Sequence, residues 1–516
     1  MNILLVYPPK TMTKSFKKLT RHTIIPPLGL AYIAAVLREG GFHNIKIVDC
    51  LIEDPEVLEG HELEEGYVRY GLTDDKIKEI IQDYDPDLVG VSIPFSMSHY
   101  DALNICKIIK ELKPLCKVVV GGSHPTNAPE LILKNPYVDF ITLGESEYTF
   151  LDLVRSMLTG ATYKDISGIA YKDENRIIIN PKLSFIEDID KIPFPARDLL
   201  PMQKYIDINC PQGDSKTKYN TTIITSRGCP YDCSFCTTKT MSGKKFRARS
   251  ADNVLAEIKF LIKEYNIKEF HIEDDNMTLN NKRAIEIFDK IIKEKSDISL
   301  VFPMGTAITT LTEEIIIRMK QVGVFSLSIA VESGNQEVID KIIGKPLKLE
   351  KVKQVANWLR KHKIKSKGFF IFGMPGETKE NMQQTIDYAK ELKLDWCGFA
   401  IATPLPGSRL YELCKEKGYI GDIDWSNLYL NQATISTNEF TPKEVAEIYK
   451  KANIELNFKE NPNLKPGGDI DQAIMDFKRV IEMAPSHTWA HLCLAKAYLI
   501  KTKKMIKYGK SSIHSG

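Results

Sequence analysis

The sequence predicts an α/β protein with two successive regions of parallel sheet and a helical tail. Short apolar segments, typical of buried parallel strands, alternate with amphipathic helices from residue 1 to about residue 155. The same alternation returns from about residue 221 to residue 417, and only helical patterns follow residue 460. The length of 516 residues fits two to four domains.

Residues 1–155 predict a doubly wound, Rossmann-like parallel sheet. The strand candidates are Ile3–Tyr7, Ile45–Asp49, Leu88–Ile93, Lys117–Val120 and Phe140–Leu143. Helical segments such as Leu28–Glu39 lie between most of them. Because such sheets bind ligands beyond the carboxyl ends of their strands, we expect ligand contacts in the loops that follow the strands. The acidic stretch Glu53–Glu65 predicts a solvated loop.

Residues 156–215 predict a hairpin at Gly168–Pro181 and a linker at Asp188–Pro201. Residues 216–420 predict a partial (β/α)6 barrel with its active groups at the C-terminal ends of the strands. Its six strand candidates are Thr222–Thr225, Glu269–Ile272, Ser299–Phe302, Ser326–Val331, Phe369–Phe372 and Gly398–Ile401.

A C-terminal extension, residues 421–465, and a helical tail, residues 466–516, are expected after the barrel. Asp469–Ala484 and Thr488–Lys501 predict two amphipathic helices. The first of them resembles the second helix of a tetratricopeptide repeat, and a plain helical hairpin packed on the barrel is the alternative. Because the tail follows a complete catalytic unit, we expect it to be dispensable for chemistry.

Composition and charge are those of an ordinary globular enzyme. Hydrophobic residues make up 43%, charged residues 27%, and the net charge is +3, which favours neither nucleic acid nor a membrane surface as partner. No apolar run approaches the roughly 20 residues of a membrane span, and the N-terminus does not resemble a signal peptide. A cytoplasmic location follows as the default. There the ten cysteines are expected as ligands or buried residues rather than disulfides.

The motif with the clearest chemistry is RGCPYDCSFC, where Cys229, Cys233 and Cys236 follow a predicted strand. Thiolates are soft ligands that suit iron–sulfur clusters, and three of them leave one iron of a [4Fe–4S] cubane open. A structural zinc site needs four ligands, usually as two Cys-x2-Cys pairs, and the sequence has no second pair. Purely structural cysteines are the other alternative. The remaining cysteines are scattered: Cys50, Cys106, Cys116, Cys210, Cys397, Cys414 and Cys493.

This motif, with Phe235 as its aromatic residue, resembles the Cys-x3-Cys-x-aromatic-Cys signature of the radical S-adenosylmethionine (SAM) superfamily. The resemblance implies that SAM chelates the open iron and is cleaved to methionine and a 5′-deoxyadenosyl radical. Later segments resemble the family's SAM-binding strand ends. The residues that they supply are Asp274 and Asp275 in HIEDDN, Glu332 and Ser333 in AVESGN, and Gly373 and Pro375 in GFFIFGMPGET. The sequence ATPLPGSRLYE resembles the sixth strand end, whereas an Arg common after the third strand is absent around Ala307.

The N-terminal segments PPLGLAYIAAVLREGGF, VGVSIPFS, GGSHPT and LGESE resemble the cobalamin-binding domain that is fused to many radical SAM enzymes. The alternative is that their glycines only form tight turns. The motif Asp-x-His-x-x-Gly, which supplies a cobalt ligand in many cobalamin proteins, is absent. We therefore expect neither His22 nor His124 on cobalt. The residues that we expect around cobalamin are Ser92, Gly121, Gly122, His124, Gly144 and Glu145.

Together these resemblances imply a cobalamin-dependent radical SAM enzyme, most simply a methyltransferase acting on an unactivated carbon of a small molecule, lipid or peptide. An oxidative cyclase or another C–C bond-forming enzyme of the same family is the alternative. A tRNA methylthiotransferase would need three more N-terminal ligand cysteines, and Cys106 lies in the middle of a predicted helix. A scaffold with a structural cluster would not need the SAM motifs. Flavodoxin or ferredoxin is the expected reductant, a protein partner for the tail remains open, and no nucleic acid is expected.

Overall fold

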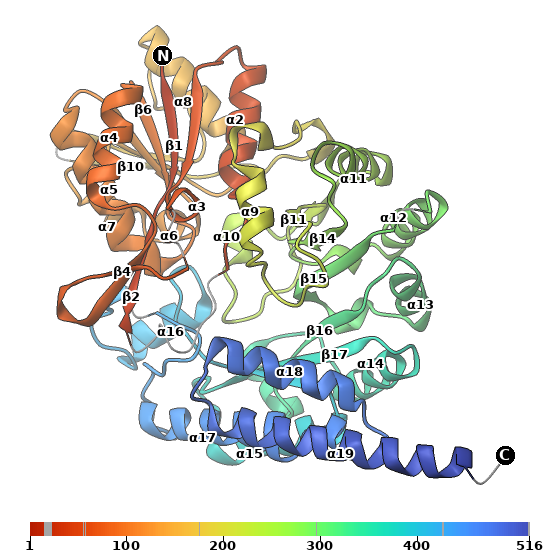
Figure 1. Ribbon diagram of the computed structural model, residues 1–516. Coiled ribbons are helices and arrows are strands. Elements are labelled where there is room, and N and C mark those ends of the chain that lie inside the picture. The colour runs from red at the N-terminus through yellow and green to blue at the C-terminus, as the bar shows by residue number, and fades with distance from the viewer. Residues whose placement is uncertain are drawn as a thin grey trace.

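The computed structural model describes residues 1–14, 23–54, 56, 58–174, 176–295, 297–425 and 428–513. It confirms the predicted α/β class: two predominantly parallel sheets lie side by side, and the helices of the tail run along one end of the second sheet (Figure 1). None of the described helices is both long enough and apolar enough for a membrane crossing.

The N-terminal domain contains a seven-stranded sheet in the order β10-β9-β8-β7-β6-β1-β3. Its strands are β1 (Ile3–Tyr7), β3 (Ile45–Asp49), β6 (Leu88–Ser92), β7 (Lys117–Gly121), β8 (Phe140–Thr142), β9 (Ile169–Asp173) and β10 (Arg176–Asn180). The first five are parallel, whereas the hairpin β9–β10 joins antiparallel at one edge, so the sheet extends beyond residue 155.

Both faces of this sheet are covered, as its mainly apolar strands require. Helices α2 (Leu28–Glu39) and α8 (Glu147–Thr159) contribute to the apolar core on one face. Helices α4 (Asp74–Tyr84) and α5 (His99–Leu112) contribute to the core on the other. Shorter helical elements of the domain are α3 (Cys50–Glu53), α6 (Ser123–Asn127), α7 (Pro129–Leu133) and the 3₁₀ turns Glu64–Gly66 and Ser96–Ser98.

The prediction missed a small antiparallel sheet in the order β2-β5-β4. Its strands are β2 (Lys10–Thr13), β5 (Tyr67–Tyr70) and β4 (His61–Glu62). The acidic stretch that predicts a solvated loop therefore contains β4. Because these strands are very short, and β2 pairs with β5 across more than 50 residues, their local sequence carries little periodic signal.

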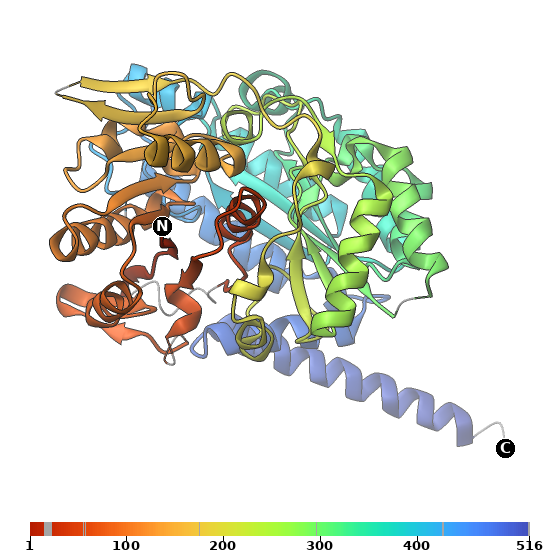
Figure 2. The ribbon, with the colours of Figure 1, turned by 90° about the horizontal axis from the view of Figure 1, so that it is seen from above.

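The second domain is an open half-barrel of six parallel strands in sequence order, as predicted. Its strands are β11 (Asn220–Ile223), β14 (Glu269–Ile272), β15 (Ser299–Thr306), β16 (Ser326–Glu332), β17 (Lys365–Phe372) and β18 (Trp396–Ile401). Its outer helices are α11 (Ala251–Tyr265), α12 (Asn281–Lys293), α13 (Glu313–Gln321), α14 (Leu349–Lys361), α15 (Lys379–Leu392) and α16 (Arg409–Lys417). These helices surround the outer side of the strands (Figure 2), and their buried apolar side chains form one continuous core with those of the strands.

The segment between the domains is packed rather than exposed. It contains α9 (Met202–Ile208), and Arg197 in the predicted linker is only 2% exposed. The guanidinium of Arg197 donates to the Thr222 carbonyl at 2.7 Å and pairs with Glu257 at 3.2 Å. A buried charge requires such partners, and they hold the segment against the barrel.

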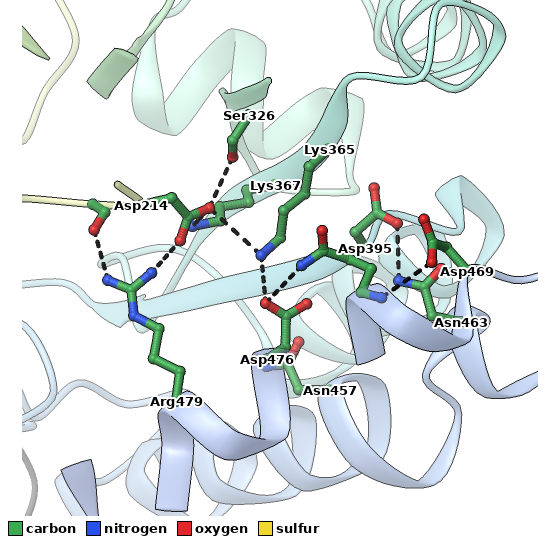
Figure 3. Close-up of polar contacts among 12 residues, drawn as sticks. Asp214, Ser326, Lys365, Lys367, Asp395, Asn457, Asn463, Asp469, Asp476 and Arg479 are labelled. Carbon is green, nitrogen blue, oxygen red and sulfur yellow. Dashed lines mark hydrogen bonds and ion pairs between the residues drawn. The ribbon is translucent and has the colours of Figure 1, made fainter. Parts of the chain in front are cut away.

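After the barrel come α17 (Pro442–Ile454), α18 (Ile470–Met483) and α19 (Thr488–Ile513). The predicted helical tail is thus confirmed, while its resemblance to a tetratricopeptide repeat stays a prediction. Helix α18 lies beside the N-terminal ends of β16 and β17, where Ser326 and Lys365 start these strands (Figure 3). There Asp476 pairs with Lys365 at the start of β17.

Arg479 of α18 pairs with Asp214, which also bonds to Ser326 at 2.9 Å and to Lys367 at 2.5 Å (Figure 3). Burial alone would raise the pKa of the Asp214 carboxyl, but Lys367, Lys365 and Arg479 hold it well below its usual range. The tail therefore completes an ionic network inside the barrel end.

Arg479→Ala is expected to lower the free energy of unfolding by about 1–2 kcal/mol at neutral pH, because a charged hydrogen bond to a largely buried carboxylate is lost. The depressed pKa of Asp214 makes its contribution complete above about pH 4 and lost as the pH falls toward the folded-state value. Urea unfolding at pH 7 and at pH 2 measures both effects. Glu482→Ala, on an exposed position of α18, is the control, and an equal effect of the two variants would contradict this role.

Candidate active site

The strand ends of both sheets meet at one cavity of about 480 Å³. On the N-terminal side it is lined by the ends of β1, β6 and β7 and by the first turn of α2. On the barrel side it is lined by residues around the cysteine loop, among them Ser226, Arg227, Glu273 and Asp275. Parallel sheets bind ligands in the loops beyond the carboxyl ends of their strands. The cavity where these ends of the two sheets meet is therefore the candidate site.

The three cysteines of the motif lie on a loop that a short ribbon, β12 (Ser226–Arg227) with β13 (Arg247–Ala248), closes at its base. Gly228 starts the loop with φ +85°, and a Cβ there would collide with the Lys245 carbonyl. Asp275 fixes this turn by accepting a hydrogen bond from the Gly228 amide at 2.8 Å. The sulfurs belong to half-buried residues, and the Thr238 amide donates to Cys236 at 3.5 Å.

The three thiols of the loop are the type of donor that an iron–sulfur cluster needs. Among the described residues no three His, Cys, Asp or Glu side chains converge as ligands of one ion. The cysteines of a cubane each bind a different iron and so lie farther apart. Burial raises the pKa of the Cys233 thiol to about 12, against the opposing ammonium of Lys345. Bound iron supplies the positive charge that such thiolates need.

The three adjacent acids of HIEDDN have different surroundings. Asp274 is buried and accepts hydrogen bonds at 2.5 Å from the amide and hydroxyl of Thr225 and the hydroxyl of Ser226, so it braces the strand end. Glu273, which was not predicted, lines the cavity, and one of its buried oxygens has no hydrogen-bond partner among the described residues. Burial, with the neighbouring Asp274 charge, raises the pKa of Glu273 to about 7.

Glu332, at the end of β16, adopts φ +68°, in the left-handed region that side chains rarely occupy. Lys345, 7% exposed, holds it with an ion pair of 2.8 Å and also donates to the Ala330 carbonyl at 2.6 Å. Strain of this kind persists only where the surroundings impose it, and it is concentrated at functional sites. Lys345 was not predicted, because a lone lysine in a charged segment carries no signal.

The other residues predicted near SAM shape the backbone. Ser333 is fully buried, and its hydroxyl is 3.0 Å from that of Thr385. Gly373 has φ +83°, and a Cβ there would lie 3.0 Å from Val445 of α17. Pro375 is buried in the same turn, and Phe235 packs at the edge of the barrel core.

Of the residues predicted around cobalamin, Ser92, Gly121, Gly122 and Gly144 line the cavity. Gly122 has φ +118°, and a Cβ there would lie 2.6 Å from the Ile93 carbonyl, so only glycine fits this turn without strain. Glu145 also lines the cavity, but both of its carboxylate oxygens pair with Arg247.

His124 is 2% exposed and does not line the cavity. Its ring nitrogens are engaged at 3.0 Å by the Ser96 hydroxyl and by His99. Burial lowers the pKa of His124 to about 3, which keeps the ring neutral. His22 lies outside the described residues.

Comparison with known proteins identifies both domains. Residues 18–154 match the B12 binding domain and residues 223–389 match the radical SAM superfamily. An uncharacterized methyltransferase of Pyrococcus horikoshii is 34% identical over 490 residues, 94% of this chain and 99% of the relative. The cytidylyl-2-hydroxyethylphosphonate methyltransferase of Streptomyces wedmorensis is 33% identical over 85% of this chain and 88% of its own length.

Two solved structures share the fold. The cobalamin-dependent SAM radical enzyme OxsB superposes with a TM-score of 0.67 at 17% identity, covering 100% of this chain and 81% of OxsB. The radical SAM methyltransferase TsrM of Kitasatospora setae gives 0.65 at 18% identity, covering 82% and 77%. The chain therefore belongs to the radical SAM superfamily, in the group that joins a B12-binding domain to the barrel, and its cofactors are a [4Fe–4S] cluster, SAM and cobalamin.

Proposed function

We propose that this protein methylates an unactivated carbon of a small-molecule substrate. The observation that carries the proposal is the single cavity lined both by the cobalamin-domain loops and by the residues that flank the cysteine loop. The two relatives of highest identity named above, which match this chain over most of its length, are methyltransferases by name. A shared cavity lets a methyl donor and a radical generator act on one substrate without its release.

We assign the cluster to Cys229, Cys233 and Cys236, SAM to the barrel strand ends around Glu273 and Glu332, and cobalamin to the glycine-lined side of the cavity. When bound, the cluster supplies the electron that cleaves SAM, and cobalamin supplies a carrier for the methyl group. The residues of this chain hold the cluster loop through Asp275, orient Glu332 through Lys345, and place the Glu273 carboxyl at the cavity.

The overall reaction balances with two molecules of SAM and two electrons. One C–H bond of the substrate, the S–CH₃ bond of one SAM and the S–C5′ bond of the other SAM break, and a C–CH₃ bond of the product and a C5′–H bond of 5′-deoxyadenosine form. The co-products are S-adenosylhomocysteine, methionine and 5′-deoxyadenosine, which receives the substrate hydrogen. The electrons come from outside the chain, and we propose a cytoplasmic flavodoxin or ferredoxin as their source.

The cyclase alternative shares the same cofactors: an anaerobic magnesium-protoporphyrin IX monomethyl ester cyclase of Rubrivivax gelatinosus is 28% identical over 78% of this chain and 68% of its own length. Methylthiotransfer is less well supported. The candidate extra ligands Cys50, Cys106 and Cys116 are at most 4% exposed within the apolar core of the N-terminal domain, and none of the three lines the shared cavity.

Cys233→Ala is expected to abolish reductive cleavage of SAM and to lower bound iron from about four per chain, because the cluster loses one of its three ligands. Iron content and 5′-deoxyadenosine formation after anaerobic reconstitution measure this. Cys414→Ala, a buried cysteine of α16, is the matched control and should keep both. SAM cleavage by Cys233→Ala at the wild-type rate would refute the cluster assignment.

With methyl-deuterated SAM and the true substrate, the label is expected in the product, with S-adenosylhomocysteine and 5′-deoxyadenosine formed in equal amounts. Equality follows because each turnover uses one SAM for each role. Mass spectrometry of product and co-products is the measurement. Unlabelled product formed with 5′-deoxyadenosine alone would exclude methyl transfer and favour the cyclase branch.

Gly29→Leu is expected to lower the cobalamin retained per chain at least tenfold, of the order expected when a buried ligand is sterically displaced. Gly29 lies in the first turn of α2 and lines the cavity, and its Cβ would meet nothing within 4 Å, so the added side chain enters empty space rather than straining the fold. Visible absorbance after desalting gives the cobalamin content. Gly421→Leu, which also has open space around it, is the control. Full retention by Gly29→Leu would place cobalamin elsewhere.

A further inference from the structure

We propose that four charged residues form a clamp between the two cofactor-binding domains: Glu145 and Glu147 of the N-terminal domain with Arg227 and Arg247 of the barrel. The clamp fixes the cobalamin-side loop, residues 144–147, to the base of the cysteine loop and so sets the approach of the two cofactors. The inference rests on the proposed methyl transfer, and its four members are positioning residues.

The ion pairs are short and directional. Arg247 grips Glu145 with two parallel hydrogen bonds of 2.7 and 2.6 Å. Arg227 donates to Glu147 at 2.6 Å and lies 3.6 Å from Glu145, which links the two pairs into one network. A bidentate guanidinium–carboxylate pair fixes orientation as well as distance, unlike a contact between apolar surfaces.

The two arginines are direct neighbours in the ribbon that closes the cysteine loop, because Arg227 pairs with Arg247 across β12 and β13. Cys229 follows Arg227 by two residues. Any movement of the glutamates is therefore transmitted to both strands from which the cysteine loop emerges. The close approach of Gly144 to α10 (Thr238–Met241), where a Cβ would lie 3.3 Å from the Met241 carbonyl, adds a backbone contact at the same place.

The side chains of the clamp are largely buried, in addition to forming short ion pairs. The side chains of Arg247, Glu145 and Glu147 are 2%, 4% and 7% exposed, and that of Arg227 is 11% exposed. Burying two adjacent guanidinium groups is unfavourable unless carboxylates neutralise them, and an apolar interface of this size would avoid the desolvation. Charged residues at this interface therefore indicate that the two domains must be held in one specific relative orientation, and not merely kept in contact.

Glu147 connects the clamp to the ligand space. One of its carboxylate oxygens binds Arg227, whereas the other is buried without a hydrogen-bond partner among the described residues, and the side chain lines the cavity. Arg227 also lines the cavity, and its guanidinium stacks on Tyr32 of α2 at 5.4 Å from the ring centre. The same residues thus bound the ligand space and join the domains.

The chain offers a matched control at a second buried ionic cluster, Arg197 and Arg249 with Glu257. Its composition and burial are similar, yet none of the three lines the cavity. Loss of this cluster affects stability without touching the contact between the cofactor loops.

The experiment compares Glu147→Gln and Arg247→Lys with Glu257→Gln in the reconstituted full-length protein. Arg247→Lys keeps the charge and loses the forked geometry, so it serves if a neutralised clamp fails to fold. With SAM and titanium(III) citrate but no substrate, methyl transfer is limited to one turnover, so the ratio measured is that of the initial rates of S-adenosylhomocysteine and 5′-deoxyadenosine formation. This ratio reports methyl transfer between the domains relative to cleavage within the barrel. Broadening of the paramagnetic cobalt signal by the reduced cluster reports their separation, and Tm reports stability.

Both clamp variants are expected to lower that ratio at least about tenfold, since a misplacement of 1 Å can cost on the order of 100-fold in rate. Both should also change the broadening, whereas Glu257→Gln should lower only Tm. An unchanged ratio and unchanged broadening in the clamp variants would overturn the proposal. Wild-type protein that makes no S-adenosylhomocysteine would count against methyl transfer, and the broadening alone would then decide for or against the clamp.

Discussion

Two parallel sheets whose carboxyl ends face one another create a site only if their relative position is fixed, and in this chain buried ion pairs provide that fixation. Glu145 and Arg247 meet with two hydrogen bonds at the point where the N-terminal loop reaches the barrel. The cavity on one side and the cysteine loop on the other both border this contact. The loops determine which side chains line the cavity, and the clamp determines the distance between its two sides.

The opposite end of the half-barrel poses a different problem, because an open barrel leaves the inner faces of its strands uncovered at the N-terminal end. Lys365 and Lys367 of β17 point toward that end, and Asp214 lies between them (Figure 3). Helix α18 closes the network with Asp476 and Arg479. Ion pairs therefore lie at both ends of the barrel. Those at the C-terminal end border the candidate active site, and those at the N-terminal end contribute to stability.

The sequence predicted those elements whose signals are local. Buried parallel strands appear as apolar runs, and cysteine spacing alone pointed to a cluster with an open iron. What it could not predict depends on pairing between distant residues. The small sheet of β2, β4 and β5 is one example. Lys345 is another, because its role depends on the ion pair that it forms with Glu332 in the folded chain. The sequence placed Glu145 at the cavity, but its pairing with Arg247 spans 102 residues and leaves no local pattern.

The three consecutive acids of β14's end show why a motif does not by itself assign roles. The carboxylate oxygens of Asp274 accept hydrogen bonds from Thr225 and Ser226, and Asp275 holds the turn at Gly228. Both aspartates therefore stabilise the local backbone. Glu273 lines the cavity, and one of its buried carboxylate oxygens has no hydrogen-bond partner among the described residues. Because its pKa is raised to about 7, both protonation states of its carboxyl are populated near neutral pH. Such a group can neutralise a cationic ligand such as SAM when ionised and donate a hydrogen bond when protonated, without a permanent buried charge in the absence of ligand. Alternation of side-chain direction along an extended segment places Glu273 and Asp275 on the cavity side and Asp274 on the other, and the hydrogen bonds of the two aspartates secure the backbone from which Glu273 acts.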